Sequence, residues 1–132
     1  MFSMSLDLDD RTVFRALLRI CKPLGIGPTT SIEAEEYFRK LLISYEGSSI
    51  DAAFESWLEQ ELAEHFLTLA GIPNWLQASE WPFANGEPLI FAGQIDYSLD
   101  DNPVAAQLFH DDTSIYVFIG TKMPSVVVMQ QM

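Results

Sequence analysis

The chain has 132 residues, which is enough for one domain built around one hydrophobic core. Hydrophobic residues make up 48% of it, too many for a disordered chain. Nineteen Asp and Glu against seven Lys and Arg give a formal net charge of −12. This balance argues against direct binding to nucleic acid or to an anionic membrane, and it favours fast association with a basic partner. An acidic surface that is simply solvated would give the same composition.

The single cysteine, Cys21, excludes an intramolecular disulfide and a cysteine-rich zinc cluster. It falls on the apolar side of a predicted helix, as a small core residue does. The first ten residues are acidic and lack the basic and apolar regions of a signal peptide. No apolar run approaches the length of a membrane span. We therefore expect a cytoplasmic protein without a membrane association.

The first half of the chain predicts three helices. Apolar residues recur at helical spacing over about residues 9–22, again between Thr30 and Gly47, and from about residue 50 to residue 65. Hydroxyl side chains stand where the second and third helices should begin. The expected caps are Thr30, in a capping box with Glu33, and then Ser48 or Ser49.

The second half predicts strands separated by turns. Residues 89–97 read as a strand with a possible bulge at Gly93, and the Asn85-Gly86 turn stands ahead of them. Residues 114–119 and 126–131 are close enough to pair as a hairpin. Two further segments are less definite. Residues 66–70 could extend the third helix or form a short strand, with the strand favoured, and residues 104–109 fit a short helix or a strand.

These elements predict an α+β fold in which N-terminal helices pack on a mainly antiparallel C-terminal sheet of three to five strands. We expect residues 1–132 to form a single domain, with a helical part over 1–68 and a strand-rich part over 69–132.

Charge is segregated along the chain. No Lys or Arg occurs from Leu41 to Thr121, whereas thirteen Asp and Glu fall in that span. This predicts a broad negative potential over the later helix and the sheet. The candidate partner-binding carboxylates are Glu55, Glu59, Glu61, Glu64, Asp100, Asp101, Asp111 and Asp112. A solvated acidic face remains the alternative interpretation.

Catalytic motifs are not recognisable in the sequence. Glu61 and His65 stand one helical turn apart, at a spacing that suits a metal or an acid–base pair. A third ligand is not evident, and a hydrogen bond on the helix surface is the favoured interpretation. His110 precedes two aspartates in a turn, and a metal there would need carboxylates from elsewhere. We therefore expect no metal or other cofactor, and the sequence does not support an enzyme.

Residues 71–97 carry two of the three tryptophans and three of the seven prolines. Trp75, Trp81 and Phe83 offer large apolar surfaces, either for a corner between layers of the fold or for a groove that binds a small molecule or peptide. Gln77 and Gln94 carry amides suited to pairing with buried backbone groups.

A family resemblance rests on two motifs in this region. They are Gly71-Ile72-Pro73-Asn74-Trp75-Leu76-Gln77 and the segment from Gly86-Glu87-Pro88 to Gln94-Ile95-Asp96. Together they resemble the signature of the YwqG-like bacterial proteins, over about residues 69–132. Some members carry a Cys-x-x-Cys pair where this chain has residues 82–86, so that metal knuckle is missing here. The resemblance implies the strand-rich fold and a genetic context that includes bacterial toxin and immunity genes.

Charge and resemblance together predict a non-enzymatic acidic binding protein. The expected partner is a basic protein, in particular a toxin or other nucleic-acid-acting protein whose basic site is covered by an immunity or inhibitor protein. The alternative is a small-molecule or peptide-binding domain that uses the three aromatic rings. The sequence does not specify an oligomeric state.

Overall fold

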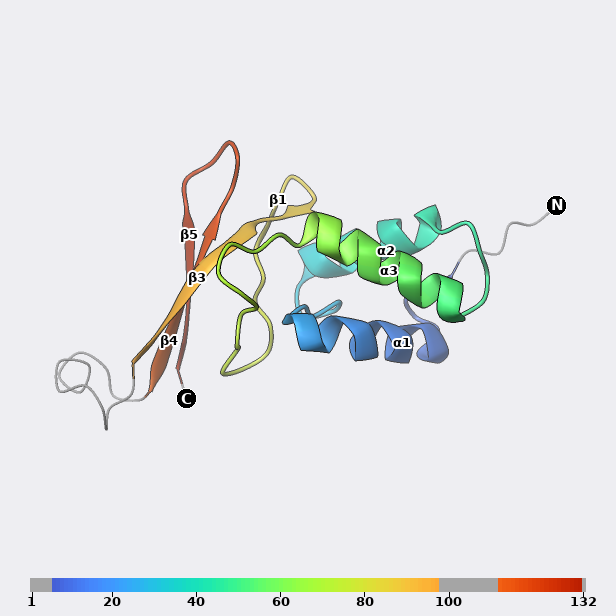
Figure 1. The fold of residues 1–132 in the computed structure, drawn as a ribbon, viewed down its shortest axis with the longest axis horizontal. Helices are drawn as coiled ribbons and strands as arrows, with labels where there is room; N and C mark the ends of the chain where they lie inside the picture. Colours follow the sequence, from blue (N-terminus) through green and yellow to red (C-terminus); the bar gives the residue numbers. More distant parts are fainter. Residues whose placement is uncertain (1–5, 98–111, 132) are drawn as a thin grey trace.

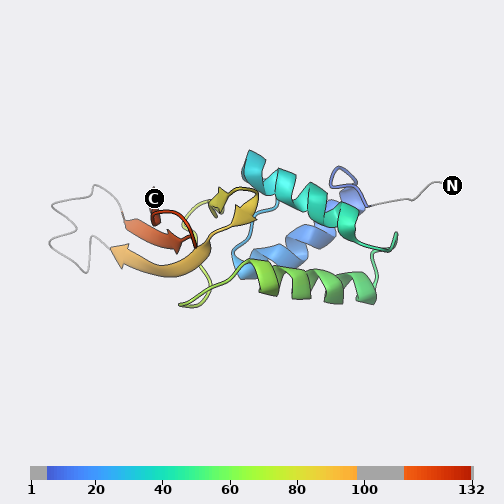
Figure 2. The same ribbon diagram turned by 90° about the horizontal axis from the view of Figure 1, so that it is seen from above.

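The computed structural model describes residues 6–97 and 112–131, which form three α-helices and an antiparallel three-stranded sheet (Figure 1). The helices and the sheet follow one another along the long axis of the molecule, joined by residues 66–89 (Figure 2). This arrangement confirms the predicted α+β fold. Within the described ranges, no helix has both the length and the apolar character needed to cross a membrane.

The helices fall where the apolar periodicity predicts them. They are α1 (Arg11–Cys21), which continues into the short 3-10 helix η1 (Lys22–Leu24), α2 (Ile32–Ser44) and α3 (Ala52–His65). Each helix buries an apolar row in the shared core, namely Val13 and Leu17 of α1, Phe38 and Leu42 of α2, and Phe54, Leu58 and Leu62 of α3.

The predicted helix caps are wrong. Ser31, not Thr30, caps α2, because its hydroxyl accepts the Ala34 amide at 3.0 Å. The Thr30 hydroxyl instead donates to the Gly27 carbonyl. Asp51 caps α3 in place of Ser48 or Ser49, with its carboxylate accepting from the Phe54 amide. Several adjacent side chains can cap each helix, and the residue with extended backbone directly before the first turn is the one that does.

Strands β3 (Ile90–Tyr97), β4 (Thr113–Ile119) and β5 (Val126–Gln131) form the sheet in the order β3-β4-β5. β4 and β5 make the predicted hairpin, and the β3 register shifts between Phe91 and Gly93, where a bulge was expected. The short strand predicted for residues 66–70 is not formed. Thr68 makes only a single parallel bridge to Phe91. The 104–109 prediction lies outside the described residues.

A small hairpin precedes the sheet. Strands β1 (Phe83–Ala84) and β2 (Glu87–Pro88) pair antiparallel across Asn85 and Gly86. These two turn residues have φ values of 53° and 78°, the positive values that a type I′ turn requires. The Asn-Gly turn predicted from the sequence therefore reverses the chain before β3.

One hydrophobic cluster runs from the helices into the sheet. Phe66, at the end of α3, packs edge-on against Trp81 with ring centroids 5.1 Å apart. Trp81 in turn contacts Phe118 of β4 and Phe91 of β3. Residues between the two halves thus continue the core from one half into the other.

Cys21 is fully buried in this core, and burial raises the pKa of its thiol from 9.0 to about 12. A pKa that is higher by about three lowers the reactive thiolate fraction about a thousandfold near neutral pH. At pH 8 we expect a disulfide reagent to label the folded protein at least about a hundredfold more slowly than protein unfolded in urea. Labelling of the native protein at the unfolded rate would contradict the burial of Cys21.

Candidate functional site

Helix α3 distributes its four glutamates over two flanks. Successive residues are rotated by about 100° around a helix axis, so Glu55 and Glu59 share one flank while Glu61 and Glu64 occupy the opposite one. The buried row of the helix lies between the two flanks on the core side. The structure therefore brings the predicted acids together in pairs and not as one patch of four.

A pocket of about 700 Å³ opens beside Glu55 and Glu59, and we call it the α3 pocket. Its volume lies in the range of sites that accept a drug-sized molecule or a large side chain. Helices α1, η1 and α3 and residues 66–72 line it together. Its apolar lining includes Ile20, Leu24, Leu62, Phe66, Ile72 and Trp81.

The two glutamates at the mouth of the α3 pocket differ in whether a cation pairs with them. Arg19, from α1, forms an ion pair with Glu55, and both side chains are partly exposed, so the pair contributes at most about 1 kcal/mol to stability. Glu59 is exposed, and no cation pairs with it in the described part of the chain. Glu59 is therefore the carboxylate at this mouth that an incoming cation meets first.

On the other flank, Glu61, Glu64 and His65 bring one ligand atom each within 4.8 Å of one another. His65 Nε2 lies 3.4 Å from Glu61 Oε2, and Gln60 donates a hydrogen bond to Glu64 at 3.2 Å. Glu64 supplies the third possible ligand beside Glu61 and His65, which the sequence analysis did not assign to this pair. Pairing and hydrogen bonding within the helix account for this surface cluster, so we infer no metal from it.

Tyr37, on α2, lies next to that cluster, with its ring centroid 6.3 Å from that of His65. Its hydroxyl is buried and has no hydrogen-bond partner among the described residues. Burial raises the pKa of Tyr37 strongly, and the nearby carboxylates of Glu61 and Glu87 raise it further. The phenol therefore stays neutral across the physiological pH range.

The three aromatic side chains of the alternative ligand groove occupy separate places. Trp75 packs on Tyr116 with ring centroids 4.3 Å apart. Trp81 is 4% exposed and donates to the Leu89 carbonyl at 2.8 Å. Phe83 lies against Tyr37 and Phe66. Of the three, only Trp81 lines the α3 pocket. Trp81 belongs to the buried core, and Trp75 and Phe83 are partly buried and pack against it.

The Gly25 carbonyl, just after η1, fixes the segment that holds Trp75. It accepts hydrogen bonds from Trp75 Nε1 at 2.7 Å and from the Ser79 hydroxyl at 3.0 Å. Gly25 has a φ of 74°, and a Cβ there would lie 2.8 Å from the Pro73 carbonyl oxygen. Both the backbone conformation and the close approach require glycine at this position.

Polar side chains on the inner face of the sheet hold residues 74–80. Gln94 accepts from the Asn74 amide and donates to the Asn74 carbonyl. The Tyr116 hydroxyl donates to the same carbonyl at 2.7 Å and accepts from the Leu76 amide. Gln130 accepts from the Gln77 amide and donates to Ala78 and Glu80. The roles of Tyr116 and Gln130 were not predicted. The feature of the sequence that could have indicated them is a polar group within an otherwise apolar strand.

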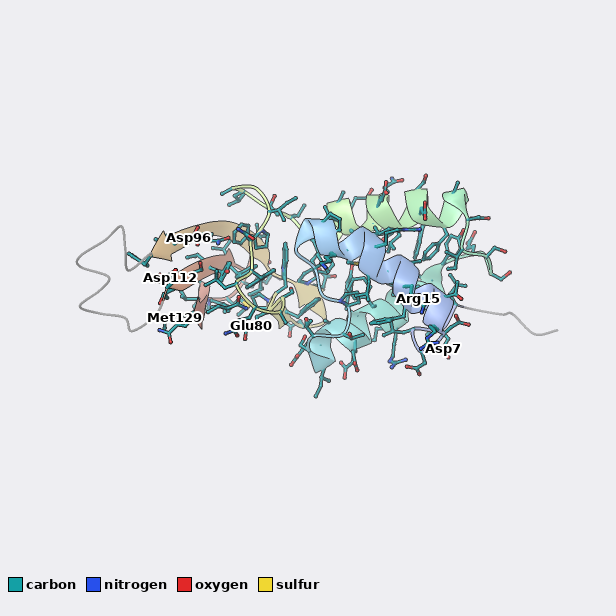
Figure 3. The ribbon with its side chains drawn as sticks, turned by 90° about the horizontal axis from the view of Figure 1, so that it is seen from below. Asp7, Arg15, Glu80, Asp96, Asp112 and Met129 are labelled. Carbon is teal, nitrogen blue, oxygen red and sulfur yellow. The ribbon has the colours of Figure 1, made fainter. Side chains whose placement is uncertain are left out.

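The remaining predicted partner-binding acids lie at the sheet or outside the described residues. Figure 3 shows Asp112 beside Asp96 at the sheet end of the molecule, with Arg15 at the helical end. Asp112 is exposed at the residue preceding β4. Asp100, Asp101, Asp111 and His110 lie outside the described residues. Among the described acids, Glu55 and Glu59 are the ones that stand beside the α3 pocket.

Comparison with known proteins finds no matching family model, curated protein or solved structure. The resemblance of residues 69–132 to the YwqG-like proteins therefore stays a prediction.

Proposed function

We propose that this chain is a non-enzymatic acidic binding protein that holds a basic protein partner at the α3 pocket. The observation that carries the proposal is the unpaired carboxylate of Glu59 at the mouth of a large, mainly apolar pocket. A partner with an apolar anchor beside a Lys or Arg matches both parts of this site.

The mechanism has two stages. The net charge of −12 attracts a basic surface over several ångströms and raises the association rate, an effect that salt screens. After contact, the apolar anchor enters the α3 pocket, which slows dissociation. The exposed carboxylate of Glu59 pairs with a cation of the partner at the rim and acts mainly on the association rate. In the specific form that we put forward, the protein is an immunity or inhibitor protein that covers the basic site of a toxin or other nucleic-acid-acting protein.

The proposal is tested with two charge-reversed proteins of equal net charge. Glu59→Lys changes the mouth of the α3 pocket, and Glu36→Lys changes an exposed acid on α2. Captured from a lysate of the source cells at low salt and then purified, the basic partner should bind Glu59→Lys at least about tenfold more weakly than wild type, or about 1.4 kcal/mol. It should bind Glu36→Lys within about twofold of wild type.

A pocket variant separates steering from anchoring. Ala63 lines the α3 pocket and is exposed, so Ala63→Trp fills the pocket without disturbing the core. We expect it to speed dissociation, whereas Glu59→Lys should mainly slow association and weaken its salt dependence. Recovery of no basic protein, or equal weakening by Glu59→Lys and Glu36→Lys, would contradict the proposal.

A further inference from the structure

Arg19 and Glu55 connect the two helical walls of the α3 pocket. Arg19 lies on α1 and Glu55 on α3, and both residues line the pocket. Glu55 is the lining residue nearest the start of α3, so their ion pair lies at that end of the pocket. A partner segment that fills the pocket at this end therefore meets the ion pair as well as the apolar lining.

The guanidinium of Arg19 shows which chemical group this end of the pocket accepts. A guanidinium is planar and carries its N–H donors in a fixed fork that matches the two oxygens of a carboxylate. Arg19 donates to a carboxylate oxygen of Glu55 from the opposite wall. Within the free protein, Arg19 thus occupies the place beside Glu55 that the guanidinium of a partner can take.

The ion pair between Arg19 and Glu55 is weak enough to be exchanged. The Arg19 side chain is 64% exposed and the Glu55 side chain 39% exposed, so water competes for both groups. An exposed pair of this kind changes a binding equilibrium by at most about fivefold. Because both groups already contact water, separating them leaves no buried charge without a partner.

An apolar anchor in the pocket favours a cation of the partner over Arg19. The anchor displaces water from the lining beside Glu55, and water then screens the charge of this carboxylate less. An arginine on the same segment as the anchor is held next to Glu55, where its effective concentration is high. Arg19 has to reach Glu55 from the other wall, and the incoming segment lies in its path.

We propose, on the basis of the proposed function of the α3 pocket, that the partner carries an arginine beside its apolar anchor and that this arginine displaces Arg19 from Glu55. Glu59 follows one helical turn later on α3, about 6 Å further along the helix axis, and pairs with a second cation. The partner segment therefore combines an apolar side chain with two basic side chains about 6 Å apart.

A synthetic peptide tests this exchange without the partner. The probe is acetyl-Trp-Arg-amide, and its control is acetyl-Trp-citrulline-amide, in which a neutral group of nearly the same shape replaces the guanidinium. Peptides of this size bind in the millimolar range, which NMR titration of the full chain measures. Arg19→Gln should bind the arginine peptide about threefold to fivefold more tightly than wild type, because Glu55 no longer has an internal partner.

Arg15→Gln is the matched control for charge. Arg15 lies one helical turn before Arg19 on α1, is exposed, and is not among the residues that line the α3 pocket. Arg15→Gln should change the affinity for the arginine peptide by less than about 1.5-fold, because it alters only the screened long-range attraction. Equal affinities of Arg19→Gln and Arg15→Gln, or an equal gain for the citrulline peptide, would overturn the proposal, as would an arginine peptide that does not bind Arg19→Gln.

The Nε signal of Arg19 gives a direct readout of the exchange. Addition of the arginine peptide to wild type should move this signal toward its position in Glu55→Gln, where Arg19 has lost its carboxylate partner. A signal that stays in place at saturation would contradict the exchange. Because the peptide stands in for the partner, failure to recover a basic protein counts against the proposed function alone, and equal peptide binding by the two arginine variants counts against the exchange alone.

Discussion

Replacing Trp81 with alanine is expected to lower the free energy of unfolding by about 3–5 kcal/mol. The indole is 4% exposed and contacts Phe66 at the end of α3 as well as Phe91 and Phe118 in the sheet. Its removal leaves a cavity where the helical and strand-rich halves meet, and it leaves the Leu89 carbonyl without its donor. Urea unfolding followed by far-ultraviolet circular dichroism measures the loss.

Trp57→Ala is the matched control, because it deletes the same atoms from a partly exposed site on α3. The Trp57 ring packs on Tyr45 and Phe54 at the edge of the helices and does not reach the sheet. We expect this variant to lose less than half as much stability. An equal or greater loss for Trp57→Ala would mean that Trp81 does not join the two halves.

Tyr116→Ala is the second substitution with a large expected effect, also about 3–5 kcal/mol. The ring is fully buried against Trp75, and the hydroxyl both donates to Asn74 and accepts from Leu76. Tyr116→Phe removes the hydroxyl alone and should cost about 1–3 kcal/mol, because the Leu76 amide loses its acceptor and the Asn74 carbonyl keeps only the Gln94 donor. Urea unfolding of both variants separates the ring from the hydroxyl.

Tyr37→Phe makes the same chemical change as Tyr116→Phe, but it should not lower the free energy of unfolding. The buried hydroxyl of Tyr37 has no hydrogen-bond partner among the described residues, so Tyr37→Phe removes an unsatisfied polar group. We expect the free energy of unfolding to stay the same or to rise by about 1 kcal/mol. If Tyr37→Phe destabilised the protein as much as Tyr116→Phe, the effect could not be assigned to the hydrogen bonds of Tyr116.

Periodicity in the sequence was sufficient to locate the helices and the last hairpin. Apolar rows at a spacing of three and four residues are required to bury one side of each helix, so α1, α2 and α3 follow from the pattern. The caps did not follow, because Thr30 and Ser31 stand side by side and either hydroxyl can accept an amide. Tertiary packing sets the direction in which the chain enters the helix, and this direction decides which of two adjacent hydroxyl residues becomes the cap.

The candidate site was predictable in part. The four glutamates of α3 were identified from charge alone, and their separation onto two flanks is already contained in the helical repeat. The α3 pocket was not predictable, since α1, η1, α3 and residues 66–72 are distant in sequence and meet only in the folded chain. Gln94 was recognised as a partner for backbone groups, whereas Tyr116 was not, because the sequence does not reveal which face of β4 turns inward.

The two hydrogen bonds accepted by the Gly25 carbonyl have a consequence for the order of folding. Trp75 and Ser79 reach this atom across 50 and 54 residues of chain. The acceptor is fixed by the end of α1 and by η1, which form from neighbouring residues. Closing such long loops carries a large entropic cost, so local helix formation precedes it. We therefore expect the helical half to form first and to act as the template on which the later half of the chain is completed.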